Sequence, residues 1–318
     1  MPHIQHLSCV LVASFLGLAG CNTIFGIDEG ELMGPGGSGG EAGVGGMAGA
    51  GGGTGGTAGS GGMAGSGGSG GAGGCSGPVS DEFDDPTTLS ACWTQVNAAL
   101  TTTFDIDTTN PDQLTIVPVA NSGSWQESIA PFLYKEITGD FLVAAYVVAE
   151  NALFLGSAPT SNYNMAGLFV RRPIAVGPPN LDEDWIKWEI GHRVDNLMPP
   201  DPIPAVGTLA ARTVSSSSAH VLPYGEEDTH ESGLAICRVG ASFDLYRRLA
   251  PGDWAVLHAL VQGTSAPNLP DTIQVGVIAG AFSAQLADIQ ARFEYVRFAP
   301  TPPAILAECE TMLETMAP

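Results

Sequence analysis

Residues 140–150, DFLVAAYVVAE, form a continuous apolar run with an acid at each end. A short apolar run of this length, rich in Val and bounded by polar residues, is typical of a strand that is buried on both faces. The stretch therefore predicts a central strand of a β-structure.

Residues 185–192 alternate between apolar and polar positions. Ile186, Trp188 and Ile190 fall on one face of a strand, which we expect to face the core. The opposite, polar face carries Trp185, Lys187 and Glu189. Trp185 is therefore expected to lie exposed.

Further strand patterns continue to the C-terminal region. Gly240-Ala241 separates two of them as a hairpin turn does, and Pro251-Gly252-Asp253 predicts another turn. Hairpins without a βαβ rhythm predict an all-β fold, an antiparallel β-sandwich. The remaining expected strands are 165–171, 234–239, 242–248, 254–262, 273–278 and 291–298.

Two regions depart from this pattern. Residues 195–231 are rich in Pro, Ser and acids with little periodicity, which predicts a long surface insertion. Within residues 300–318, apolar side chains recur at helical spacing and predict a short C-terminal helix. They are Ile305, Cys309, Met312, Leu313 and Met316.

The N-terminus predicts export. An apolar run too short to span a bilayer ends at Leu18-Ala19-Gly20-Cys21, which resembles the lipobox of bacterial lipoproteins. The resemblance implies a signal peptide over residues 1–20 and lipidation of Cys21, hence a membrane partner. In the family rule Asp after the cysteine retains a protein at the inner membrane, so Asn22 favours the outer membrane. The leader departs from the usual pattern because it lacks Lys and Arg.

A glycine-rich tether follows the lipobox. Residues 34–77 contain 25 glycines in 44 positions, and glycine has much backbone entropy to lose and no side chain to bury. We predict a lipidated N-terminus and flexible linker over residues 21–77, a sandwich domain over 78–299 and the helical tail.

The charge excludes one class of partner. The chain carries a formal net charge of −22, and from Cys75 onward 29 acidic residues stand against 11 basic ones. Such a chain repels phosphate backbones, so nucleic-acid binding is not expected.

Four cysteines remain for disulfides after Cys9 leaves with the signal and Cys21 takes lipid. An exported chain with four cysteines predicts two disulfides in one of three connectivities. Because the ends of a sandwich often lie close together, we expect Cys75–Cys309, with Cys92–Cys237 as the second pair.

Three segments together resemble the concanavalin A-like superfamily. They are Asp81-Glu82-Phe83-Asp84-Asp85 with Leu89 and Trp93, then Tyr246 through Pro251-Gly252-Asp253-Trp254, and last residues 273–278 with Arg292-Phe293-Glu294-Tyr295-Val296. The resemblance covers about residues 80–299 and implies that kind of sandwich. Because the superfamily contains lectins, glucanases and many uncharacterised modules, it implies the fold better than the function.

Motifs for catalysis or metal binding are sparse. The glucanase pattern Glu-x-Asp-x-x-Glu is absent, and Glu189 has no acidic partner two residues away, as a retaining glycosidase needs. Glu231 lies in an irregular acidic stretch. No cofactor is expected, and Asp182 and Asp184 are the only weak candidates for Ca²⁺ ligands, as oxygen donors in an acidic turn.

Aromatic side chains are the best binding signal, because sugar rings stack on indole and phenol faces. Trp185, on the polar face of its strand, and three residues expected in loops are the candidate ligand-binding residues: Trp125, Tyr163 and Tyr224. We expect a non-catalytic module that binds a glycan or cell-envelope polymer. A structural envelope protein and a glycoside hydrolase are the alternatives.

Overall fold

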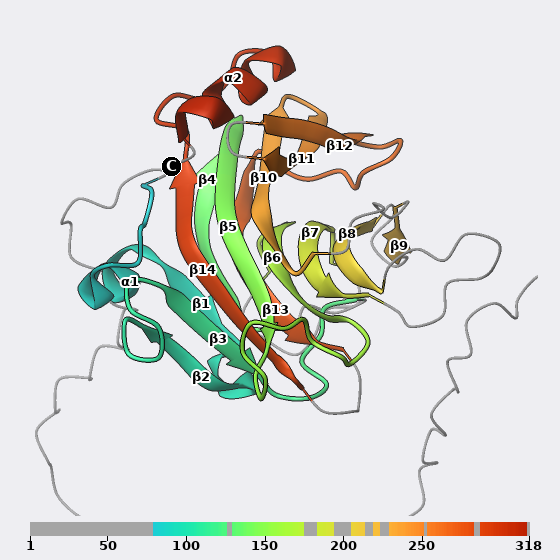
Figure 1. Cartoon of the computed structure of the whole chain (residues 1–318). Coiled ribbons are helices and arrows are strands. Elements are labelled where there is room, and N and C mark those ends of the chain that lie inside the picture. The colour runs from blue at the N-terminus through green and yellow to red at the C-terminus, as the bar shows by residue number, and fades with distance from the viewer. Residues whose placement is uncertain are drawn as a thin grey trace, which may run out of the picture. The chain divides into compact units, whose positions relative to one another are not determined.

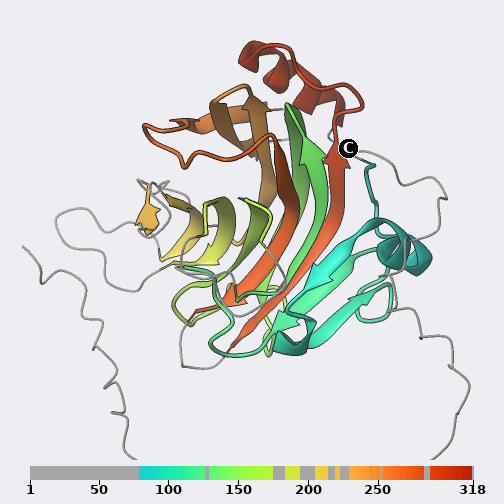
Figure 2. The same cartoon turned by 180° about the vertical axis from the view of Figure 1, so that it is seen from behind.

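The computed structural model describes residues 79–125, 129–174, 183–193, 205–213, 219–222, 229–250, 253–282 and 287–316. Within them, two seven-stranded antiparallel sheets lie face to face (Figures 1 and 2). The predicted all-β antiparallel sandwich is thereby confirmed.

Each sheet is named after one of its inner strands, β7 or β5. The β7 sheet has the order β1 (Thr94–Val96), β4 (Phe132–Thr138), β13 (Thr272–Ala281), β6 (Asn164–Arg171), β7 (Trp185–His192), β8 (Val206–Thr213) and β9 (Ala219–Val221). The β5 sheet has the order β12 (Asp253–Val261), β11 (Ser242–Ala250), β10 (Glu231–Val239), β5 (Phe141–Asn151), β14 (Ile289–Phe298), β3 (Leu114–Pro118) and β2 (Thr101–Ile106). Three helical segments accompany them: α1 (Pro86–Cys92), the 3-10 turn Ala98–Leu100 and α2 (Leu306–Met316).

Strand β5 is buried on both faces, as its apolar run predicted. Val143, Ala145 and Val147 point between the sheets into the main core. Leu142 and Ala144 point the other way, into a second apolar cluster that α2 completes. Helix α2 therefore covers one end of the outer face of the β5 sheet (Figure 1), and a period-two strand needs no polar face where a helix covers it.

The segment before β1 is fixed by Asp81. Its carboxylate accepts hydrogen bonds from the Phe83 N–H at 2.9 Å and from Trp93 Nε1 at 2.7 Å, and its backbone pairs with Val296. Lys135 Nζ lies 4.3 Å from the centre of the Trp93 ring. Burial lowers the pKa of Lys135 to about 8, against the attraction of Asp81. These contacts anchor the first of the three segments on which the superfamily resemblance depends.

The prediction of a long surface insertion over residues 195–231 is wrong in part. Strands β8 and β9 lie inside that range and extend the β7 sheet. Strand β8 was missed because its apolar positions are small: Ala210 faces the core while Leu209 and Ala211 are buried on the other face. Two-sided burial of small side chains leaves no alternating hydrophobic signal. The C-terminal helix was predicted correctly.

The predicted disulfide pairings are contradicted. Cys237 on β10 is bonded to Cys309 on α2, with their Cα atoms 6.3 Å apart, so neither Cys75–Cys309 nor Cys92–Cys237 forms. The pairing follows from the packing of α2 on the β5 sheet, where Cys237 points outward beneath the helix. Cys92 is also disulfide-bonded, and Cys75 lies outside the described residues.

The signal peptide, the lipidation of Cys21 and the glycine-rich linker all lie outside the described residues. Among the helices that are described, none has the length and apolar character needed to cross a membrane.

Non-reducing peptide mapping should recover the Cys237 peptide linked to the Cys309 peptide. Replacing Cys309 by Ala should lower the free energy of unfolding by about 4 kcal/mol, because the cross-link joins residues 72 apart and restricts the unfolded chain. Ala307→Ser, on the exposed side of the same helix, is the control and should change little. Recovery of Cys309 linked to Cys75 would contradict the structure.

Candidate functional site

The outer face of the β7 sheet carries an unusual concentration of buried aromatic side chains. Phe132, Tyr134, Phe169 and Trp185 form its centre, and they pack ring against ring with centroid distances of 5.1 Å for Phe132–Phe169 and 5.9 Å for Phe169–Trp185. We call this group the outer-face cluster. It gives the β7 sheet a second apolar layer on the side away from the main core.

The alternation of β7 is as predicted, but the exposure of Trp185 is not. Ile186, Trp188 and Ile190 face the main core, and Trp185 faces outward. Trp185 is nevertheless 0 % exposed, because Phe169 packs beside it and Trp125 packs at 6.3 Å from the β3–β4 connection. The prediction of an exposed platform at Trp185 is therefore wrong.

Of the three remaining aromatic candidates, two lie within the described residues. Trp125 and Tyr163 are half-buried and both contact the ring of Phe282, at 6.4 and 5.9 Å between centroids. Phe282 itself is 44 % exposed. Trp125, Tyr163 and Phe282 thus form an accessible aromatic rim beside the outer-face cluster. Tyr224 lies outside the described residues.

Charged groups lie among these rings. Lys187 Nζ lies 2.8 Å from Glu189 Oε2, donates to the backbone oxygen of Ser124 at 3.0 Å, and lies 5.7 Å from the ring centres of both Trp125 and Trp185. Both members of the Lys187–Glu189 pair are buried. A buried ion pair costs desolvation that apolar packing alone would avoid.

A second polar pair occupies the neighbouring row of the same face. Arg171 pairs with Trp185 across one strand boundary and with Gln274 across the other, and its Nε donates to Gln274 Oε1 at 2.7 Å. Burial lowers the pKa of Arg171 from its ordinary value, while Glu183 opposes that shift. The guanidinium also lies over the Phe132 ring at 5.0 Å.

One buried donor on this face is unsatisfied. Among the described residues, Trp185 Nε1 has no hydrogen-bond partner although the side chain is fully buried. A buried N–H without a partner costs roughly 1–3 kcal/mol, and in natural proteins such groups commonly meet an ordered water or a ligand.

The position on β6 next to Glu189 carries no side chain. Gly167 on β6 pairs with Glu189 on β7, and a Cβ at position 167 would lie 2.1 Å from the backbone oxygen of Trp188. Only glycine therefore permits the two strands to approach as they do.

The acidic residues considered for catalysis are not brought together. Glu189 lies on β7, and its charged neighbour is Lys187 rather than a second acid. Glu231 begins β10 in the other sheet. A retaining glycosidase requires two carboxyl groups about 5–5.5 Å apart, and these two glutamates belong to different layers.

Of the two weak Ca²⁺ candidates, only Asp184 lies within the described residues. Asp184 is buried and forms an ion pair with Arg172, and Asp182 lies outside the described residues. Across the described ranges, no group of three or more His, Cys, Asp or Glu side chains is placed to hold a metal ion.

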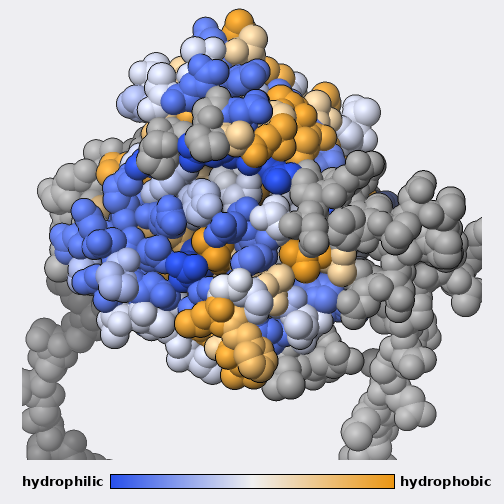
Figure 3. Space-filling view, in the orientation of Figure 1, coloured by the Kyte–Doolittle hydropathy of each residue, from blue (hydrophilic) through white to orange (hydrophobic). Residues whose placement is uncertain are grey.

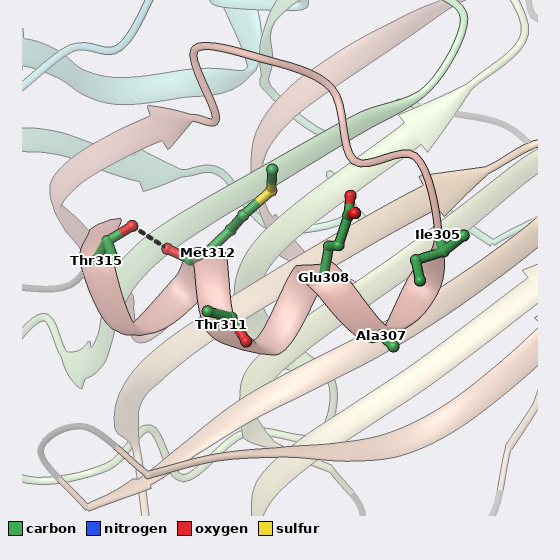
Figure 4. Close-up of a pocket in the computed structure, with 6 residues that line it drawn as sticks. All are labelled: Ile305, Ala307, Glu308, Thr311, Met312 and Thr315. Carbon is green, nitrogen blue, oxygen red and sulfur yellow. Dashed lines mark hydrogen bonds between the residues drawn. The ribbon is translucent and has the colours of Figure 1, made fainter.

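A hollow of about 430 Å³ lies along the outer side of α2 (Figure 4). Helix α2 packs on the β5 sheet, whereas the outer-face cluster belongs to the β7 sheet. The hollow is shallow, and Glu308 is the only ionisable residue that lines it; Thr315 Oγ1 donates within the helix, to the Met312 oxygen at 2.7 Å. The hollow therefore lacks converging polar groups, and the outer-face cluster with its rim is the better candidate site.

Sequence reasoning found part of this site. The sequence predicts Trp125 and Tyr163 as binding residues, and the alternation of β7 places Lys187 and Glu189 on the correct face. The missed members lie on other strands and were not marked by any local motif: Phe132, Tyr134, Phe169, Arg171, Gln274 and Phe282. The alternation of β6 was the available signal, because Phe169 and Arg171 share one face of it.

Comparisons with known proteins find solved structures with a similar fold but no matching family. No protein-family model matches the chain, and no curated protein matches it at a significant level. A mutant of the GH43 protein BlXynB from Bacillus licheniformis is similar in structure, with 13 % identity and a TM-score of 0.51 over 69 % of this chain and 38 % of that one. The chain thus spans about two fifths of the length of the GH43 protein.

Lectin I-B4 from Griffonia simplicifolia is another similar structure, with 14 % identity and a TM-score of 0.43 over 69 % of this chain and 98 % of the lectin. At such low identity a structural likeness concerns the fold alone. The antiparallel β-sandwich predicted from the sequence is the fold found.

Alanine substitutions in the buried outer-face cluster and at its rim should differ in their effect on the free energy of unfolding. Trp185→Ala should lower the free energy of unfolding by about 3–5 kcal/mol, because it leaves a large cavity. Trp125→Ala, at the half-buried rim, should cost less than half as much. Urea denaturation of both variants measures this, and an unchanged midpoint for Trp185→Ala would mean that the indole is exposed in solution after all.

Proposed function

We propose that this protein binds a carbohydrate or cell-envelope polymer at the aromatic rim of the β7 sheet, without cleaving it. The observation that carries the proposal is the rim of Trp125, Tyr163 and Phe282, which lies beside buried charged groups on one face of the sandwich. Accessible rings next to fixed donors and acceptors are the groups that recognise a sugar, which has apolar ring faces and hydroxyl edges.

The polar groups beneath the rim are held in fixed positions. Lys187 pairs with Glu189 and Arg171 with Gln274, and all four side chains are buried, so they would position the rings that a sugar contacts. Groups that are already positioned lose little conformational freedom when a ligand arrives. The similarity of the fold to a GH43 protein is compatible with a carbohydrate ligand and supports that choice of ligand class.

The charge arrangement favours binding over hydrolysis. The charged neighbour 2.8 Å from Glu189 Oε2 is the Lys187 ammonium group, whereas a retaining glycosidase needs a second carboxyl group about 5–5.5 Å away. The position two residues before Glu189 on the same face is Lys187, where a paired-carboxylate strand would carry an acid.

Binding is tested with the full chain on an array of glycans and cell-wall polymers. For a polymer that binds, Trp125→Ala should weaken the affinity by about 1–3 kcal/mol, roughly 5- to 150-fold, because one stacking face is lost. Tyr146→Ala, on β5 in the other sheet, is the matched control and should bind normally.

Two results would contradict this function. Equal loss of affinity in both variants would place the site elsewhere. Turnover of a polysaccharide by the full chain, abolished by Glu189→Gln, would show that the protein is a hydrolase.

We also propose that the protein is a lipoprotein, anchored through Cys21 to the outer membrane of a bacterial envelope. The support is the lipobox-like sequence Leu18-Ala19-Gly20-Cys21 with Asn22 after it. A diacylated cysteine holds a protein on a membrane, since each buried CH₂ contributes about 0.8 kcal/mol.

Intact-mass analysis of the membrane fraction should show a chain that begins at Cys21 and carries acyl groups. Cys21→Ser should release the protein from that fraction, and Cys92→Ser is the control that should leave it there. A mature chain with another N-terminus, or an unmodified Cys21, would rule out the anchor.

A further inference from the structure

The connection between β5 and β6 exposes three consecutive large apolar side chains. Leu153 is 73 % exposed, Phe154 70 % and Leu155 64 %. We call these three residues the apolar tip. A hydrophobic group lies at the lower edge of the space-filling view (Figure 3), where this connection lies in Figure 1. Singly exposed apolar residues are ordinary, but three adjacent ones on a projecting turn are not.

The turn that carries the tip is held rigidly by its own hydrogen bonds. Asn151 Oδ1 accepts from the N–H groups of Leu153 and Phe154 at 2.9 and 3.1 Å. The N–H of Gly156 donates to Glu150 Oε2 at 3.0 Å, and Asn151 N donates to the Ser157 oxygen at 2.7 Å. Gly156 adopts a φ of +81°, which a residue with a side chain would resist.

The rest of the connection is clamped by one buried carboxylate. Asp288, just before β14, accepts from Thr160 N at 2.8 Å, from Thr160 Oγ1 at 2.7 Å and from Asn151 Nδ2 at 3.2 Å. Burial would raise the pKa of Asp288, but hydrogen bonds from Thr160, Asn164 and Ser161 outweigh it and lower the pKa. The carboxylate therefore stays ionised and the connection stays fixed.

Charge is absent from this part of an acidic chain. Between Glu150 and Arg171 the sequence contains no Asp, Glu, Lys, Arg or His. Backbone groups that are already hydrogen-bonded and side chains without charge are what a segment needs to enter a nonpolar phase, since each unpaired polar group would cost several kcal/mol there.

From these features we infer that the apolar tip inserts into the interfacial layer of a lipid bilayer. A protein partner is the poorer fit, because three convex side chains offer on the order of a few hundred Å², whereas a stable protein interface buries about 800 Å² on each side. A bilayer requires only that Leu and Phe side chains enter its interfacial region, roughly 5–10 Å deep. Because the chain is strongly acidic, the insertion should not depend on anionic lipids.

The experiment uses the full chain with Cys21→Ser throughout, so that no acyl group contributes to binding. This background protein should float with vesicles of pure phosphatidylcholine. Adding Leu153→Ser and Phe154→Ser should lower the partition coefficient at least tenfold, with an unchanged melting temperature because both side chains are exposed. Ile305→Ser is the matched control: Ile305 is 57 % exposed and lies beside α2 at the other end of the sandwich (Figure 1).

A second experiment measures by fluorescence quenching how deeply the apolar tip enters the bilayer. In the same background, Phe154→Trp should be quenched by brominated phosphatidylcholine more strongly than the background protein. Failure of the background protein to bind phosphatidylcholine, equal loss with Ile305→Ser, or no added quenching would each overturn the inference. So would sedimentation of a dimer that the tip substitutions dissociate, because the tip would then serve a second copy of the chain. None of these outcomes concerns glycan binding at the rim.

Discussion

The fold depends on a strand that must be buried on both sides. The apolar run of β5 cannot tolerate water on either face, so one face enters the core between the sheets and the other is covered by α2. Covering the second face places Cys309 over Cys237, and the disulfide then fixes the helix to β10. The burial of one strand thus determines where the C-terminal segment must lie.

The outer face of the β7 sheet is shielded from water by side chains of its own strands. This face is closed by aromatic rings with an ion pair and a guanidinium among them. Apolar packing alone would close the face at lower electrostatic cost. The retention of Lys187, Glu189 and Arg171 in buried positions, beside a half-open aromatic rim, is the feature that distinguishes this face from an ordinary second core.

Both proposed contact regions lie at the end of the sandwich away from α2. The rim is built where β6 begins and β13 ends, and the apolar tip projects from the connection between β5 and β6. Tyr163 closes that same connection, and Asp288 clamps it. Rigidity at this end comes from buried hydrogen bonds, which position exposed side chains at little further entropic cost.

The sequence by itself determined the strand periodicity, the two-sided burial of β5, the C-terminal helix and which face of β7 each side chain occupies. All of these follow from local sequence patterns, namely alternation on β7, an unbroken apolar run on β5 and helical spacing in the tail, whose periods are set by backbone geometry. Only the tertiary structure decided that Trp185 is buried, that Cys237 pairs with Cys309, that β8 joins the β7 sheet, and that Phe282 meets Trp125 and Tyr163. Alternation tells which way a side chain points, but whether another segment covers it depends on contacts between residues far apart in the chain.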